Sequence, residues 1–215
     1  MKAVAPVDLL LDRRRERVDQ VVADRIRSLT LLVEGVHDPH NLAAILRTAE
    51  GLGLQDVHVL EAQSGFRPSE AVTQGADKWL TLHRHRDAVT CATALRAEGY
   101  ALYASLLSGD AIPLDAVPFE GRVALVFGNE HDGVSPELAG LCDGNFRIPM
   151  HGFTQSFNVS VAVAIALHAG ASARRRLAPG GDLPPDAQSE LRLRFYARAV
   201  KQGRRLARAL ARSPS

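Results

Sequence analysis

The chain has 215 residues, a net charge of +2, and apolar and charged fractions of 46% and 23% that are ordinary for a folded protein. This length allows one main domain with a sizeable core and terminal appendages, and Cys91 and Cys142 form no C-x-x-C pair, which argues against a disulfide framework. The first residues show only a brief apolar stretch before an arginine cluster, so we expect no secretion signal, no membrane partner and a cytoplasmic location.

Charge is distributed unevenly along the chain. Residues 1–29 carry a net +2 and residues 171–215 a net +8, which leaves the segment 30–170 at −8. Arginine-rich helices are often no more than solvated faces, but segregation of this degree favours a polyanion held by the basic ends. We therefore expect a nucleic acid as partner, with the chemistry carried by the middle of the chain.

The first half of the chain alternates helices and strands. A turn after the first strand places Asn41 where the N-cap of a helix belongs, and apolar residues then recur at helical spacing up to Gly53. The predicted helices cover 9–28, 41–53, 70–77 and 88–98, and the predicted strands cover 29–36, 57–60 and 79–82.

The second half continues this alternation and ends in a basic helix. The predicted strands are 100–107, 123–127 and 146–150, and the predicted helices are 135–141, 159–167 and, after a Gly/Pro-rich linker, 186–212. Near-continuous apolar strands joined by helices are typical of a parallel sheet covered on both faces. The sequence therefore predicts an α/β fold.

Three polar loops follow predicted strands, at 37–41, 128–133 and 151–158. The carboxyl ends of parallel strands are where α/β sheets hold ligands, and the last loop also leads into a helix N-terminus. Ser156 or Asn158 acting only as an N-cap is the alternative for that loop. No G-x-G-x-x-G or P-loop pattern is present, and Glu130, His131 and Asp132 have no second ligand cluster at metal spacing, so we expect no metal.

Three segments together resemble the signature motifs of the SpoU family of RNA ribose 2′-O-methyltransferases. They are NLAAILR at 41–47, FGNEHDG at 127–133 and IPMHGFTQSFNVSV at 148–161, in the order and spacing of that family. The resemblance covers roughly residues 29–170. Within the family, segment 36–53 and the basic terminal helices are most similar to the members that methylate guanosine 18 in the D-loop of tRNA.

The resemblance implies an α/β sheet whose C-terminal part is threaded as a deep trefoil knot, and a homodimer with both active sites near the interface. It implies S-adenosylmethionine as cofactor and tRNA as substrate. Carried onto this chain, the family's cofactor site corresponds to Leu106, Gly128, Ile148, Met150 and Phe157. The catalytic positions correspond to Asn41, Arg47, Glu130, Ser156 and Asn158, and arginines of the first helix, Arg14, Arg17 and Arg25, are expected to bind RNA.

A ribose hydroxyl is a poor nucleophile, so its proton must leave as it attacks the methyl group of the sulfonium. In the family the counterpart of Arg47 is proposed as the base, assisted by an RNA phosphate. A guanidinium is normally only a donor, so Arg47 gripping the phosphate and polarising the hydroxyl, while phosphate or water takes the proton, is an equally sensible role.

Two other functions remain open. One is an rRNA 2′-O-methyltransferase of the same family, but those relatives commonly carry a separate N-terminal RNA-binding domain, whereas about 28 residues precede the first strand here. The other is a non-catalytic RNA-binding module, which the presence of all five catalytic positions disfavours. The expected organisation is a basic helix at 1–28, a methyltransferase domain at 29–177, and a linker with a basic helix at 178–215.

Overall fold

The computed structural model describes residues 10–60, 75 and 78–210. The chain divides into two compact units. The α/β unit is Ile26–Pro179, and the helical unit combines Met1–Arg25 with Gly180–Ser215. The short helix predicted at 70–77 lies outside the described residues, except for Gly75.

The α/β unit is built on a seven-stranded sheet in the order β3-β2-β1-β6-β4-β7-β5, and every pair of neighbouring strands is parallel. The central strands are almost continuously buried, as their apolar sequences predict. The strands are β1 (Leu29–Glu34), β2 (Asp56–Leu60), β3 (Thr81–His85), β4 (Tyr100–Ser105), β5 (Ile112–Pro113), β6 (Arg122–Phe127) and β7 (Gly144–Arg147).

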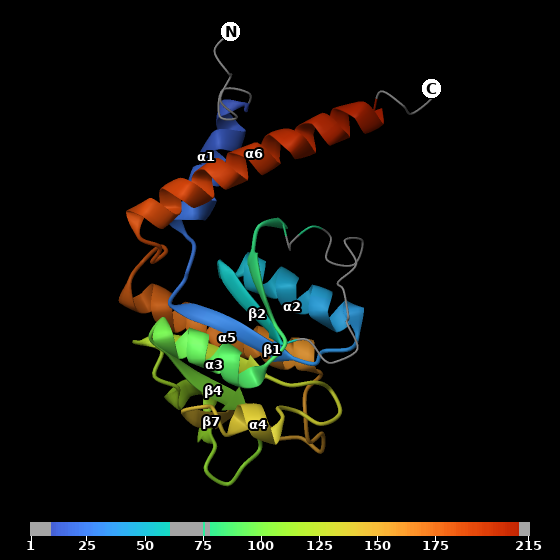
Figure 1. The fold of residues 1–215 in the computed structure, drawn as a ribbon, viewed down its shortest axis with the longest axis vertical. Helices are drawn as coiled ribbons and strands as arrows, with labels where there is room; N and C mark the ends of the chain where they lie inside the picture. The colour runs from blue at the N-terminus through green and yellow to red at the C-terminus, as the bar shows by residue number, and fades with distance from the viewer. Residues whose placement is uncertain (1–9, 61–74, 76–77, 211–215) are drawn as a thin grey trace. The chain divides into compact units, whose positions relative to one another are not determined.

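Helices cover both faces of this sheet (Figure 1), which confirms the predicted α/β fold. Leu31 and Val33 of β1 share one buried cluster with α2 (Pro39–Gly51) and α5 (Val159–Leu177). Leu32, which points to the opposite face, belongs to a second cluster with α3 (Ala88–Ala97) and α4 (Pro136–Ala139). Successive strand residues face opposite sides of a sheet, so one apolar strand supplies both cores.

The small residues of α5 allow this helix to lie close to the sheet. A methyl group added at Gly170 would stand 2.8 Å from the ring of Phe119 and 2.9 Å from Leu29. The first turn of α5 follows directly on the loop 148–158, so the tight seating of α5 also fixes the end of that loop. Within the described residues, no helix is long and apolar enough to cross a membrane.

The helical unit pairs α1 (Asp12–Ala23) with α6 (Pro185–Leu210), as Figure 1 shows. Val18 and Val22 of α1 are buried, as are Leu191 and Phe195 of α6. A polar contact accompanies this apolar seam, because Asp19 accepts hydrogen bonds from Arg192 Nε at 2.8 Å and from Tyr196 Oη at 2.6 Å.

Three local predictions were wrong. The strand predicted at 146–150 is β7, Gly144–Arg147, and residues 148–150 belong to the loop that follows it. The N-cap of α2 is Asp38, whose side chain accepts from the backbone N–H of His40, and Pro39 takes the first helical position, so Asn41 lies inside the helix. The third strand is Thr81–His85 and not 79–82, because its alternating His and Arg residues belong to a half-exposed edge strand and carry no apolar run.

Candidate active site

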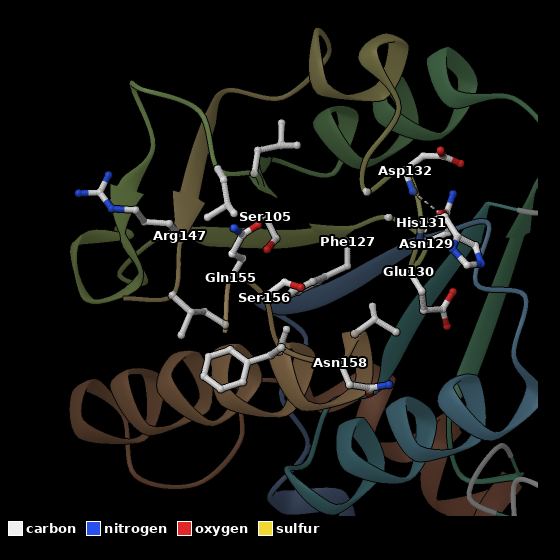
Figure 2. A pocket seen from close by; sticks show the side chains of 18 of the residues that line it. Ser105, Phe127, Asn129, Glu130, His131, Asp132, Arg147, Gln155, Ser156 and Asn158 are labelled. Atoms are coloured by element: carbon white, nitrogen blue, oxygen red, sulfur yellow. Dashed lines mark hydrogen bonds between the residues drawn. The ribbon is translucent and has the colours of Figure 1, made fainter. Parts of the chain in front are cut away.

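A cavity of about 540 Å³ opens at the carboxyl ends of three neighbouring strands, β6, β4 and β7. The loops that follow these strands line it, together with the first turn of α5. Figure 2 shows the loop at 128–133 and the segment at 155–158 facing the same space. A cavity of this size at this edge of a parallel sheet is typical of a small-molecule site.

The loop Gly128–Gly133 forms one wall and is held in a tight turn. Backbone hydrogen bonds of 3.2 Å join Asn129 and Gly133 in both directions, and Gly133 has a φ of +70°. The side chain of Asn129 accepts from the N–H groups of His131 and Asp132, both at 2.8 Å. A Cβ on Gly128 would lie 1.7 Å from the carbonyl oxygen of Gly133, so only glycine fits there.

The floor of the cavity is apolar. Phe127 and Phe146 pack edge to face with their ring centroids 5.7 Å apart, and both line the cavity. Leu106 donates its backbone N–H to the carbonyl of Phe146 at 3.1 Å, which ties the end of β4 to the end of β7. Ile148, Met150 and Phe157 extend this apolar surface along the last loop. Such a surface suits a flat, partly apolar ligand group.

A chain of hydrogen bonds joins three segments that are far apart in sequence. Asn158 Nδ2 donates to Asn41 Oδ1 at 3.2 Å, and Asn41 Nδ2 donates to Glu130 Oε1 at 2.6 Å. Asn158 also caps α5, because its Oδ1 accepts from the backbone N–H of Ser160 at 2.9 Å. The N-cap role and a role in the site are therefore compatible in the same residue.

The structure brings together most of the residues singled out from the sequence. Leu106, Gly128, Ile148, Met150 and Phe157 all line the cavity, as do Glu130, Ser156 and Asn158. Asn41 reaches this group through its two hydrogen bonds.

Arg47 differs from the other predicted catalytic residues. Its exposed side chain lies on α2 and is not among the described residues that line the cavity. The cavity is formed without Arg47. The predicted catalytic role of Arg47 therefore depends on how the RNA substrate binds.

Sequence reasoning gave no role to Asn129, although its side chain holds the turn of the 128–133 loop. The signal was an Asn between a strand end and a glycine-containing turn, where its short amide readily bonds to backbone N–H groups two and three residues on. Gln155 also lines the cavity, next to Ser156 (Figure 2).

The arginines of α1 separate into two kinds. Arg14 and Arg17 are exposed and line a shallow surface of the helical unit with Leu11, Arg13, Glu16 and Gln20. The predicted RNA-binding role of Arg25 is corrected by the structure: its side chain is only 1% exposed, and its guanidinium lies 5.5 Å from the ring centroid of Phe195. A buried guanidinium over an aromatic ring contributes to packing and does not face a polyanion.

Comparisons with known proteins agree with this geometry. A profile of the SpoU rRNA Methylase family matches residues 28–168. The tRNA (guanosine(18)-2′-O)-methyltransferase of Borreliella burgdorferi is 34% identical over 89% of this chain and 88% of its own length. The enzyme of the same name from Thermus thermophilus is 38% identical over 79% of this chain and 86% of its own.

Two solved structures are also similar. The Aquifex aeolicus TrmH/SpoU tRNA modifying enzyme matches with a TM-score of 0.79 and 28% identity, over 87% of this chain and 96% of that one. The SpoU methyltransferase AviRb from Streptomyces viridochromogenes, solved in complex with the cofactor AdoMet, matches with a TM-score of 0.60 and 25% identity, over 72% of this chain and 62% of that one.

Proposed function

The chain belongs to the SpoU RNA methylase family, and we propose that it transfers the methyl group of S-adenosylmethionine to the ribose 2′-hydroxyl of guanosine 18 in the D-loop of tRNA. The observation that carries this proposal is the cavity at the ends of β6, β4 and β7, which gathers the three family segments around one hydrogen-bonded group, Asn41, Glu130 and Asn158. The names of relatives at 34% and 38% identity supply the substrate.

The cavity residues fit the cofactor. Gly128 allows the tight turn of the 128–133 loop at the cavity wall, because any side chain there would collide with Gly133, and Leu106, Ile148 and Met150 offer an apolar surface beside backbone polar groups. When bound there, S-adenosylmethionine supplies an electrophilic methyl group on a positively charged sulfur. The loop 128–133 and the apolar surface hold the cofactor, and the space toward Glu130 and Asn158 receives the ribose.

The reaction then needs a positioned hydroxyl and a way to remove its proton. Asn41, Glu130, Ser156 and Asn158 orient the ribose at the rim of the cavity. Arg47 acts from outside the cavity wall, on the exposed side of α2, where it binds a phosphate of the RNA and polarises the hydroxyl. The phosphate or a water molecule takes the proton, because a guanidinium is a donor.

The proposal includes a deep trefoil knot and a homodimer. In support of the knot, β7 lies between β4 and β5 in the sheet although it follows both in sequence, so the chain re-enters a sheet between two earlier strands. In support of the dimer, the loop beside the cavity presents apolar side chains to solvent: Phe153 is fully exposed, and Phe157 and Val161 are 39% and 45% exposed.

The proposal assigns RNA binding to the two ends of the chain. The basic residues at 1–28 and 178–215 flank the methyltransferase domain at 29–177, and Arg14 and Arg17 contact phosphates of the tRNA. The division into the units Ile26–Pro179 and Met1–Arg25 with Gly180–Ser215 supports this organisation. The proposed tRNA substrate supports a cytoplasmic location.

Methyl transfer from labelled S-adenosylmethionine to unmodified tRNA and to rRNA, with nuclease mapping of the product, tests the proposal. We expect 2′-O-methylguanosine at tRNA position 18. Label in rRNA alone would replace the tRNA function with that of an rRNA methyltransferase. Absence of both label and cofactor binding would contradict the enzymatic function and leave an RNA-binding module.

A further inference from the structure

A cluster of histidines lies at the edge of the sheet formed by β2 and β3, which in strand order is the end away from the cofactor cavity. In the parallel register of these strands, His58 pairs with His83, and Leu60 pairs with His85. Because alternate residues of a strand share a face, His58, His83 and His85 project from the same face. Leu60 shares a buried cluster with Cys91 of α3, so this is the face that α3 covers.

The side chains of His58, His85 and Cys91 converge within the α/β unit. The ligand atoms of His58, His85 and Cys91 all lie within 4.8 Å of one another. Nδ1 of His58 and Nε2 of His85 are only 3.0 Å apart. Cys91 is fully buried and His58 is 5% exposed, whereas His85 is half-buried and lies toward solvent.

The cluster is compact enough to be compared with a tetrahedral zinc site. With Zn–N near 2.0 Å and Zn–S near 2.3 Å, tetrahedral geometry requires N···N of ~3.3 Å and N···S of ~3.6 Å. The His58 Nδ1···His85 Nε2 distance is 3.0 Å, and all three ligand atoms lie within 4.8 Å of one another, so zinc binding would need small adjustments of these side chains. Zinc and its borderline neighbours prefer two imidazoles and one thiolate over the oxygen ligands of magnesium or calcium. Burial raises the pKa of Cys91 to about 12, so the thiolate would form only as the metal displaces the thiol proton.

The surroundings keep the imidazoles in the form that binds metal. Burial lowers the pKa of His58 to about 3 and also lowers the pKa of His85, so both rings are neutral near pH 7. His83 stacks on His58 with ring centroids 4.5 Å apart, and its Nε2 lies 2.8 Å from Asp56 Oδ1. Asp56 in turn accepts from Arg27 Nε at 3.2 Å, which fixes the stacked ring next to the cluster.

We propose that His58, His85 and Cys91 bind one zinc ion, with solvent in the fourth position on the His85 side. The ion joins β2, β3 and α3, and so fastens α3 to the edge of the sheet. The site stands apart from the cofactor cavity, since none of its three residues lines that cavity among the residues described. The competing arrangement is a neutral His58–His85 hydrogen bond beside a buried thiol.

Cobalt(II) titration of the chelator-treated full chain distinguishes the metal site from the neutral His58–His85 hydrogen bond. We expect one equivalent to give a thiolate-to-cobalt charge-transfer band and intensified tetrahedral d–d bands. The chain has two cysteines, so Cys142→Ser should keep these bands and Cys91→Ser should lose the charge-transfer band. His85→Ala, at a half-buried position, should weaken cobalt binding by at least on the order of tenfold.

Thermal unfolding gives a readout that does not depend on colour or on catalysis. Zinc should raise the midpoint of the wild-type chain and of Cys142→Ser, and at the same zinc concentration it should raise that of His85→Ala by clearly less. Absence of a saturable band in the wild type, or an unchanged band in Cys91→Ser, would overturn the proposal. If Cys91→Ser does not fold, loss of the band in Cys142→Ser would overturn it, and its retention would assign the thiolate to Cys91. Methyl transfer is not a readout, so this test is independent of the proposed function.

Discussion

Asn41 is the side chain on which the polar end of the cavity depends. Its amide oxygen accepts from Asn158 and its amide nitrogen donates to Glu130, so both ends of one amide are used. This arrangement fixes which way the amide of Asn41 points and holds the Glu130 carboxylate at a defined place on the rim. The helix α2 therefore contributes to the site by joining two loops, and it also carries Arg47, for which a catalytic role is proposed.

Replacement of Arg47 by Ala tests the division between binding and chemistry. Because Arg47 lies outside the cavity wall, we expect cofactor affinity to change by no more than about twofold, while methyl transfer falls by roughly 10²-fold or more. Arg47→Lys is the matched variant: it keeps the charge but loses the planar fork, and should be intermediate. Methyl transfer close to the wild-type rate in Arg47→Ala would remove this residue from the mechanism.

Tyr196 gives a prediction about pH within the helical unit. Burial first, and then the hydrogen bond and charge of Asp19, raise the pKa of Tyr196 to about 12 from its ordinary 10.0. Between pH 10 and pH 12 the hydroxyl of Tyr196 keeps its proton in the folded chain but has lost it in the unfolded chain. The stability contributed by this pairing is therefore complete below pH 10 and is lost as the pH rises through about 12.

Ultraviolet titration of tyrosine ionisation, taken as the difference between the native chain and Tyr196→Phe, isolates this group. We expect the difference to have its midpoint near pH 12. A midpoint near 10 would show that Tyr196 is not held by Asp19.

At the scale of elements, the loop between β6 and α4 depends on Gly128. In Gly128→Ala the new methyl group would meet backbone atoms of Gly133 and Val134 at 1.7–2.2 Å, and backbone cannot rotate away as a side chain can. We expect a loss of about 2 kcal/mol or more in the free energy of unfolding and at least ~10-fold weaker cofactor binding.

Gly121→Ala is the control for Gly128→Ala, since among the described residues beyond its chain neighbours no atom lies within 4 Å of a Cβ at Gly121, and its φ is not positive. Calorimetry of S-adenosylmethionine binding and thermal unfolding measure both effects. Equal behaviour of the two variants would contradict the tight turn as the basis of the cofactor site.

The sequence predicted elements well where apolar periodicity was clear and poorly where polar residues decided the structure. Leu29–Glu34 and Arg122–Phe127 are apolar runs and were placed almost without error. The start of α2 was misplaced because Asp38 and Asn41 are both good N-caps, and Pro39 decides between them only if it is taken as the first helical residue. β3 was shifted because an edge strand with alternating His residues shows no apolar run.

The histidine cluster could not be predicted for a different reason. His58 and His85 are 27 residues apart, and they meet only through the pairing of β2 with β3. Register is a property of the folded sheet, and the expectation of no metal considered only ligands close together in sequence. By contrast, the family segments at 127–133 and 148–161 identified most of the cavity residues, because they follow β6 and β7 and the carboxyl ends of parallel strands lie at one edge.

In the whole molecule, negative and positive charge are concentrated in different segments of the chain. The segment 30–170 carries −8 and contains the cofactor cavity, whereas 171–215 carries +8. An acidic body repels a polyanion, so we expect the proposed RNA binding to depend on the basic parts. Composition does not show which arginines are exposed to solvent. Arg14 and Arg17 are exposed, but Arg25 is buried against Phe195.

Exchange of Arg14 and Arg17 for Gln tests the contribution of α1. Each lost phosphate contact lowers the slope of log affinity against log salt by roughly 1, so we expect the double variant to lose about 2 and to bind tRNA more weakly at low salt. The control Arg14→Lys with Arg17→Lys keeps both charges and should retain the slope. Filter binding across a salt series measures it, and an unchanged slope in the Gln variant would mean that these arginines do not contact RNA.

The most direct test of the central claim changes one hydroxyl group. Two tRNA molecules identical except at guanosine 18, one with ribose and one with 2′-deoxyribose there, are incubated with the enzyme and labelled S-adenosylmethionine. We expect stoichiometric label in the first and none in the second, with similar affinity for both. Equal labelling of the two would show that the methyl group goes elsewhere and would contradict ribose 2′-O-methylation at this position.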